Sequence, residues 1–267
     1  MKLKIFQADA FTKSIFGGNP AALVPLTEWL PDSVMQNIAN ENNLAETAFI
    51  IPTGGKSDYH IRWFTPSIEV RLCGHATLAT AHILYEQLGF DKSEIRFESL
   101  SGILSVKKQK ENNYTLDFPT DILRGYALDS KEAQIIESVL NARPLAVFKG
   151  RDDFMAILSS EKEVAALKPN FAGLKHLDAR GLIATAKGEV VDFVSRCFFP
   201  EAGIEEDPVT GSAHTTMTPY WAEKLGKNHL TARQISARGG ALTCILRGVR
   251  VDISGEAVTY LVGDIFV

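Results

Sequence analysis

Three ionisable residues stand in sequence surroundings that suit proton transfer. Glu46 lies in the segment LAETA, His75 in CGHAT, and Asp207 at the end of the acidic run in EEDPVTGSAH. The apolar residues around position 46 would partly desolvate its carboxyl group, which suits a general acid or base. Positioned carboxylate and imidazole groups can move a proton to and from carbon. The three residues are therefore a candidate catalytic set.

Each of these residues also has a purely structural interpretation. Glu46 could face solvent from a strand, and His75 could serve only to cap a helix. Asp207, beside two glutamates, could belong to a solvated acidic loop that complements a helix dipole. The local sequence leaves these alternatives open.

Two helix starts could supply the binding groups for such a site. The segment 211–226 predicts a helix from Ser212 through Leu225 that is closed by Gly226, and the segment 74–89 predicts a similar helix opened by a glycine. Free backbone N–H groups and the helix dipole favour anions at such ends. We expect Gly74, Gly211 and Ser212 to bind a substrate carboxylate in a cleft between the halves, without arginine, lysine or metal.

The two helices belong to an internal repeat. Segments 44–48, 62–66 and 74–89 resemble segments 182–186, 196–200 and 211–226, at an offset of 134 to 138 residues. The candidate catalytic residues are the places where the halves differ. Glu46 aligns with Ala184, His75 aligns with Ser212, and a three-residue insertion in 201–210 brings in Asp207. The asymmetry favours a function for all three positions.

The remaining sequence predicts the elements that hold these residues. Short β-branched and aromatic runs predict strands at 48–52, 59–66, 95–99, 103–109 and 114–119. The helix after Gly74 is apolar on most faces, which is typical of a buried helix. Each half is therefore predicted to form a curved sheet around a central helix, an α+β arrangement. We place the domains at 1–118 and 119–267, with the last strand free to return to the first half.

Composition excludes several classes of function. The formal net charge of −4 and the lack of a basic run argue against nucleic acid as a partner. No apolar run is long enough to span a bilayer, and the first residues lack a signal-peptide core. Three scattered cysteines indicate reduced thiols and a cytoplasmic location. No nucleotide-binding or metal-binding pattern is present, so we expect no cofactor and no metal.

The motifs together resemble those of the PhzF family of phenazine biosynthesis-like isomerases. The residues that carry the resemblance are DAFT and FGGNPAALV (9–24), NNLAETAFI (42–50), RLCGHATLATAH (71–82) and EEDPVTGSAH (205–214). The resemblance implies a diaminopimelate epimerase-like fold with two pseudo-symmetric domains, each a barrel-like sheet round a central helix. It also implies a cofactor-independent isomerase that forms a homodimer. By the same resemblance Glu46 is the acid/base, His75 and Asp207 support it, and Gly74, Gly211 and Ser212 contact the substrate carboxylate.

One position departs from the related two-thiol epimerases. Cys73 precedes Gly74, but its counterpart before Gly211 is Thr210, and a hydroxyl is a far poorer acid or base than a thiol. A Cys73-dependent racemase or dehydratase therefore remains as an alternative, beside a non-catalytic binding protein on the same fold. The sequence predicts a small carboxylate-bearing substrate, a cyclic amino or hydroxy acid, without identifying it.

Overall fold

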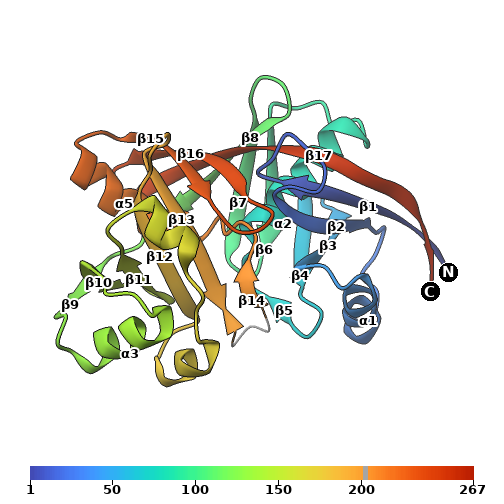
Figure 1. Cartoon of the computed structure of the whole chain (residues 1–267). Coiled ribbons are helices and arrows are strands. Elements are labelled where there is room, and N and C mark those ends of the chain that lie inside the picture. Colours follow the sequence, from blue (N-terminus) through green and yellow to red (C-terminus); the bar gives the residue numbers. More distant parts are fainter. Residues whose placement is uncertain (201–203) are drawn as a thin grey trace. The chain divides into compact units, whose positions relative to one another are not determined.

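The computed structural model describes residues 1–200 and 204–267, so residues 201–203 of the predicted insertion lie outside the described part. The chain forms two compact units (Figure 1). The first contains Met1–Phe118 together with Ile253–Val267, and the second contains Pro119–Asp252. The sequence left open whether the end of the chain returns to the first half, and these last residues do so.

The first unit is mainly β-structure. Its strands are β1 (Lys2–Ala10), β2 (Asn19–Pro25), β3 (Glu46–Pro52), β4 (Tyr59–Phe64), β5 (Glu69–Val70), β6 (Glu94–Ser99), β7 (Gly102–Lys108), β8 (Asn113–Pro119) and most of β17 (Arg250–Phe266). Its helices are α1 (Asp32–Asn42) and α2 (Gly74–Glu86). The strands predicted from the sequence at 48–52, 59–66, 95–99, 103–109 and 114–119 are confirmed as β3, β4, β6, β7 and β8.

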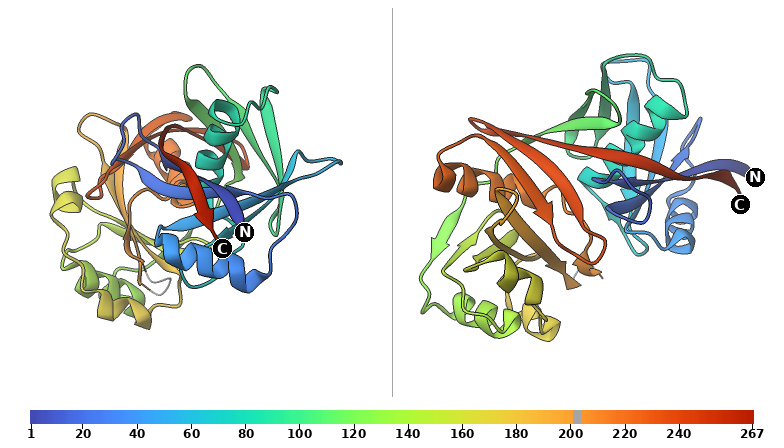
Figure 2. Two further views of the ribbon diagram at one scale, coloured as in Figure 1. Left: turned by 90° about the vertical axis from the view of Figure 1, so that its right-hand side faces the viewer. Right: turned by 45° about the horizontal axis from the view of Figure 1, so that its top comes forward.

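The strands of the first unit close into a barrel. Neighbouring pairs run in the order β1, β2, β3, β4, β6, β7, β8 and β17, and β17 pairs again with β1. The β1–β17 pairing aligns Lys2 with Phe266, so the two termini lie side by side (Figure 2). A closed barrel leaves few unpaired strand edges, which protects the backbone groups of its strands.

The second unit is also built mainly of strands. Its strands are β9 (Arg124–Tyr126), β10 (Ala146–Lys149), β11 (Asp153–Ile157), β12 (Gly181–Lys187), β13 (Phe193–Phe199), β14 (Ile204–Asp207), β15 (His229–Gln234) and β16 (Gly240–Arg247). Its helices are α3 (Lys131–Leu140), α4 (Glu161–Ala166), the 3-10 helix η1 (Phe171–His176) and α5 (Ala213–Leu225).

The strand pairings confirm the internal repeat. In the first unit β1–β2 is antiparallel, β2–β3 parallel, β3–β4 and β4–β5 antiparallel, β4–β6 parallel and β6–β7 antiparallel. The pairs β10–β11, β11–β12, β12–β13, β13–β14, β13–β15 and β15–β16 follow the same sequence of directions. The pseudo-symmetric organisation predicted from the sequence is therefore present strand by strand.

An equivalent ion pair occupies the same place in both units. Arg62 binds Glu69 through Nε and Nη2 at 2.7 and 2.6 Å and lies 5.2 Å from the Phe64 ring centroid. Arg196 binds Glu206 at 2.7 and 2.8 Å, and its guanidinium lies 5.3 Å from the Phe198 ring. The glutamate comes seven residues after the arginine in the first unit and ten after it in the second. The predicted three-residue insertion thus falls between the two members of the second pair.

A central helix packs against the strands of each unit. Helix α2 contacts β1, β2, β3 and β7, and twelve consecutive residues from Gly74 to Tyr85 are buried. Its small side chains at 76, 77, 79, 80 and 81 allow strands to approach closely on several faces. Helix α5 contacts β11, β15 and β16, and it ends at Gly226 in the left-handed conformation, as predicted. In the described part of the chain, no helix has the length and apolar character needed to cross a bilayer.

Candidate active site

The first residue of β3 is Glu46, which lies opposite Ala21 in the parallel pairing with β2. Ala48, Phe49 and Ile50, which follow it on alternate faces of the strand, are all buried. The side chain of Glu46 is only 12 % exposed. The alternative that Glu46 is a solvent-facing strand residue is therefore wrong.

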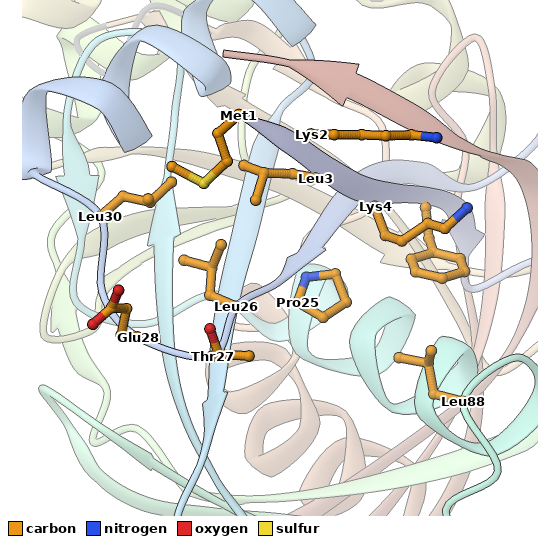
Figure 3. Close-up of a pocket in the computed structure, with 11 residues that line it drawn as sticks. Met1, Lys2, Leu3, Lys4, Pro25, Leu26, Thr27, Glu28, Leu30 and Leu88 are labelled. Atoms are coloured by element: carbon orange, nitrogen blue, oxygen red, sulfur yellow. The ribbon is translucent and has the colours of Figure 1, made fainter.

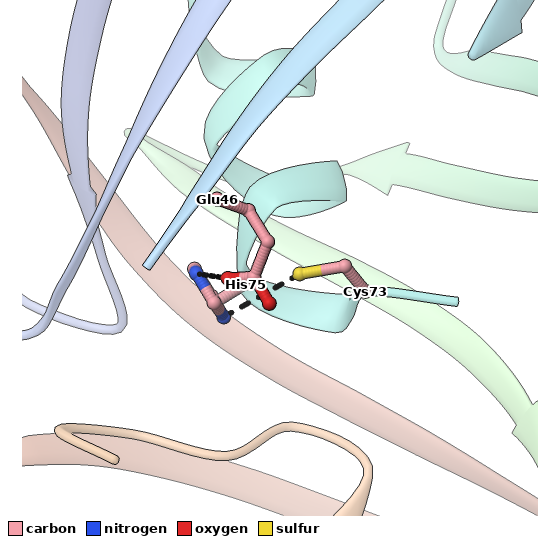
Figure 4. Close-up of side chains that lie close together, drawn as sticks. All are labelled: Glu46, Cys73 and His75. Carbon is pink, nitrogen blue, oxygen red and sulfur yellow. Dashed lines mark hydrogen bonds and ion pairs between the residues drawn. The ribbon is translucent and has the colours of Figure 1, made fainter. Parts of the chain in front are cut away.

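Glu46 and His75 are brought together within the first unit. The Oε2 atom of Glu46 lies 2.9 Å from Nε2 of His75, and the histidine is 4 % exposed as the second residue of α2. This is an ion pair by distance, and neither atom has a hydrogen-bond partner in the described part of the chain. Figure 4 shows the two side chains converging in front of the first turn of the helix, with the Cys73 thiol beside them. His75 thus contacts a carboxylate rather than merely capping its helix.

The charge on His75 is set by its neighbours. Burial by itself opposes the imidazolium, but the interactions with Cys73 and Glu46 raise the pKa of His75 well above 6.5. Burial also raises the pKa of the Cys73 thiol to about 11, with a further contribution from Glu46. Since Cys73 is then a neutral thiol near pH 7, Glu46 is the group that favours the imidazolium there.

The raised pKa of His75 makes the stability of the protein depend on pH. A histidine whose pKa is higher in the folded state stabilises that state fully below its unfolded pKa of about 6.5 and loses this contribution as the pH rises through the folded value. The unfolding free energy of the wild type relative to His75→Gln is therefore expected to fall as the pH is raised above 6.5. Urea unfolding at several pH values measures it, with the exposed His229→Gln as the control. A difference that grows with pH would contradict the assignment.

Glu46, Cys73 and His75 also have the composition of a metal site. Their potential ligand atoms lie within 4.8 Å of one another. However, the carboxylate meets the ring at Nε2, whereas the Cys73 sulfur lies 3.6 Å from Nδ1. Each metal–ligand bond to a histidine uses one ring nitrogen, so this arrangement joins the groups through opposite edges of the imidazole. The geometry favours a chain of proton-exchanging groups.

The other predicted residues belong to separate places in the two units. Gly74 is the first residue of α2 and is buried beside His75. Asp207, Gly211 and Ser212 lie in the second unit, around the start of α5. Asp207 is 6 % exposed and accepts a hydrogen bond of 2.5 Å from the Thr210 hydroxyl, so the interpretation as a solvated loop residue is wrong.

Two residues near these positions were missed by sequence reasoning. Asn19 is fully buried, and its Nδ2 lies 3.1 Å from Nδ1 of His75. Arg180 donates from Nε to the buried Asp153 at 2.9 Å and from Nη2 to Ser212 Oγ at 3.3 Å. The start of α5 was expected from the sequence to bind a carboxylate without arginine, and the contact of Arg180 with Ser212 corrects this. Asn19 entered the sequence analysis only within the segment FGGNPAALV, with no role of its own, and Arg180 carried no motif.

A separate groove opens on the first unit. It has a volume of about 410 Å³, and its lining includes Lys2, Lys4, Leu26 and Leu88 (Figure 3). None of its lining residues belongs to the Glu46–His75 cluster. The groove is therefore separate from that cluster.

Comparison with known proteins identifies close relatives over the whole chain. The family model described as phenazine biosynthesis-like protein matches residues 8–263. An uncharacterized isomerase of Pseudomonas aeruginosa is 48 % identical, with 99 % of each chain covered. The crystal structure of a phenazine biosynthesis protein of the PhzF family from Enterococcus faecalis is 44 % identical, with a TM-score of 0.94 and complete coverage of both chains.

More distant structures share the fold alone. A hydroxyproline epimerase from Agrobacterium vitis superimposes with a TM-score of 0.63 at 10 % identity, covering 99 % of this chain and 91 % of that one. The diaminopimelate epimerase-like fold expected from the sequence motifs is confirmed by these neighbours together with the strand pairings.

Proposed function

The chain belongs to the PhzF family of phenazine biosynthesis-like isomerases, and from this membership we propose that it moves a proton between carbons of a small carboxylate-bearing substrate. The observation that carries the proposal is the nearly buried carboxylate of Glu46, held 2.9 Å from His75 Nε2. Glu46 removes the proton from one carbon and returns it to another. His75 supports the carboxylate through changes in its own protonation.

The proposal assigns roles to the remaining predicted residues as well. Gly74, Gly211 and Ser212 bind the substrate carboxylate through the N–H groups of their helix starts, and Asp207 assists proton transfer. Because a side chain performs the transfer, the reaction needs no bound cofactor. Fixed positioning and electrostatic stabilisation of the developing charge supply the remaining rate enhancement.

A screen in heavy water tests the proposed reaction. Cyclic and acyclic amino and hydroxy acids are incubated with the enzyme, and deuterium uptake at carbon is followed by mass spectrometry. We expect uptake into at least one cyclic acid, because a proton that passes through a side chain exchanges with solvent. Binding of an acid without any uptake would contradict the proposal and favour a non-catalytic binding protein.

A second candidate function uses the thiol of Cys73, as in a one-thiol racemase or dehydratase. The contact that favours it is the 3.6 Å distance between Cys73 Sγ and His75 Nδ1. Against it stands the burial of the thiol, which raises its pKa to about 11 and keeps it protonated near pH 7.

Replacement of Cys73 separates the two candidates. Cys73→Ala is expected to keep deuterium exchange within about tenfold of wild type, because truncating a small buried side chain disturbs packing without removing the base. Cys244→Ala is the matched control, since Cys244 is a buried free cysteine of β16 in the second unit. A loss of a thousandfold or more in Cys73→Ala alone would transfer the catalytic role to the thiol.

Two further parts of the proposal concern the setting of the enzyme. The family resemblance supports a homodimer, and three free buried cysteines support a reducing, cytoplasmic location. Sedimentation of the purified protein and fractionation of the source cells measure these properties.

A further inference from the structure

Asn19 contacts the imidazole of His75 at Nδ1, the ring nitrogen that Glu46 does not contact. It is the first residue of β2, its side chain is fully buried, and its Nδ2 lies 3.1 Å from Nδ1 of the histidine. Glu46 occupies the other ring nitrogen at 2.9 Å. The imidazole is thus held between an amide from β2 and a carboxylate from β3.

The turn that delivers Asn19 to this position is conformationally costly. Phe11 and Phe16 have φ values of 63° and 73°, in the left-handed region that residues other than glycine seldom adopt. Gly18, with φ of 61°, adopts the same region as a glycine can. The turn is fixed by a 2.9 Å hydrogen bond from the Phe16 N–H to the buried carboxylate of Asp9. Such backbone strain persists where the surrounding structure determines it, and it gathers at functional sites.

The orientation of the Asn19 amide and the position of the proton on His75 are linked. An amide nitrogen can only donate, so Nδ2 next to Nδ1 requires Nδ1 to accept. The proton of the neutral ring is then on Nε2, where it faces the Glu46 carboxylate.

The imidazolium form makes the opposite demand on Asn19. Glu46 favours this form, and an imidazolium donates from both nitrogens, so Nδ1 then needs an acceptor. The Cys73 sulfur, 3.6 Å from Nδ1, is only a weak one. A primary amide satisfies both demands, since a half-turn of its terminal group replaces Nδ2 by Oδ1 at the same place. Aspartate could only accept, and an aliphatic side chain could do neither.

We propose that Asn19 is the positioning residue of His75: its amide holds Nδ1 in both protonation states and so keeps Nε2 beside Glu46 Oε2, at 2.9 Å. This inference depends on the proposed function only for its effect on catalysis. The tautomer and the protonation of the ring are properties of the resting protein.

Nitrogen NMR of the His75 ring tests the inference directly. The wild type is expected to show, above the His75 pKa, a neutral ring protonated on Nε2; the signals are assigned by their loss in His75→Gln. In Asn19→Asp the added carboxylate stabilises the imidazolium, so the His75 pKa is expected to rise further. In Asn19→Ala the neutral ring loses its fixed tautomer. Besides Asn19, the groups acting on the ring are Glu46 from β3 and Cys73 before α2, and Asp9 at the end of β1 is engaged by Phe16.

Activity and pH dependence provide the second readout. Both Asn19 variants are expected to lose about tenfold in rate, equivalent to one hydrogen bond, and Asn19→Asp is expected to shift the pH profile upward with the His75 pKa. The exposed Asn112→Asp is the control for the added charge, and circular dichroism checks folding.

A neutral wild-type ring protonated on Nδ1, or an unchanged His75 titration and tautomer in a folded Asn19→Asp, would overturn the inference. If Asn19→Ala fails to fold, the isosteric Asn19→Asp still decides the matter. Full activity in Glu46→Gln would instead refute the proposed function and leave the NMR result intact.

Discussion

Substitution of Glu46 by Gln is expected to lower the rate of deuterium exchange by about two to four orders of magnitude, the usual contribution of a general acid or base. Glutamine has nearly the same shape, and its carbonyl oxygen can take the place of Oε2 beside His75 Nε2. It cannot, however, take up or release a proton. The substrate that emerges from the heavy-water screen is used for both proteins.

The effect of Glu46→Gln must be separated from loss of binding or folding. Substrate affinity, measured by calorimetry, is expected to change little, because the proposed binding groups are the N–H groups at the helix starts. The matched control is Glu98→Gln, which alters an exposed glutamate of β6 in the same unit and should leave the rate unchanged. Retained exchange in Glu46→Gln would remove the carboxylate from the mechanism.

The fold was predictable because its signals are local and occur twice. Each barrel strand around α2 carries alternating or β-branched residues, and the paired segments repeat at nearly one offset. Arg62 with Glu69 and Arg196 with Glu206 show what the repeat preserves in three dimensions. Helices α1, α3 and α4 were not predicted. For α3 the signals were present in the sequence, since Ala133, Ile136, Val139 and Leu140 form one buried face and Ser130 caps the start.

The candidate site was predictable only where the repeat is broken. Glu46 and His75 were predicted because the sequence alignment sets them against Ala184 and Ser212, and the structure places the two in contact. The strand register corrects the first alignment: Phe49 lies opposite Arg62 and Ala184 opposite Arg196, so the counterpart of Glu46 is Gly181. Asn19 gave no such signal, because a buried asparagine and a turn asparagine look alike in sequence. Its role depends on a ring 56 residues away, a contact that only the three-dimensional structure reveals.

The contact with His75 bears on the role proposed for Glu46, the first residue of β3. Near neutral pH the buried Cys73 is an uncharged thiol, so the charge balance of the cluster rests on Glu46 and His75. A proton moved onto Glu46 weakens its hold on the imidazolium, and a proton removed restores it. In the proposed mechanism, the pair therefore couples each transfer at carbon to the protonation of the ring.

The second large effect is expected at Gly18, the residue before Asn19. Its φ of +61° would strain alanine by about 1–2 kcal/mol, and an added Cβ would lie 2.1 Å from the Ala10 carbonyl oxygen. Ala10 pairs with Asn19 in the β1–β2 ladder, so relief of this clash requires the start of β2 to move. Gly18→Ala is expected to lower the unfolding free energy by about 2–5 kcal/mol, the sum of backbone strain and overpacking.

Gly89→Ala separates the two contributions to that loss. Gly89 has a similar φ of +70°, but nothing lies within 4 Å of the Cβ position, so only the cost of about 1–2 kcal/mol for the left-handed backbone is expected. Urea unfolding of both variants measures the difference. Because a displaced β2 also displaces Asn19, Gly18→Ala should lose deuterium exchange under conditions where it is still folded, whereas Gly89→Ala should keep it. Equal losses of stability and activity in the two variants would show that the turn before β2 does not hold the site.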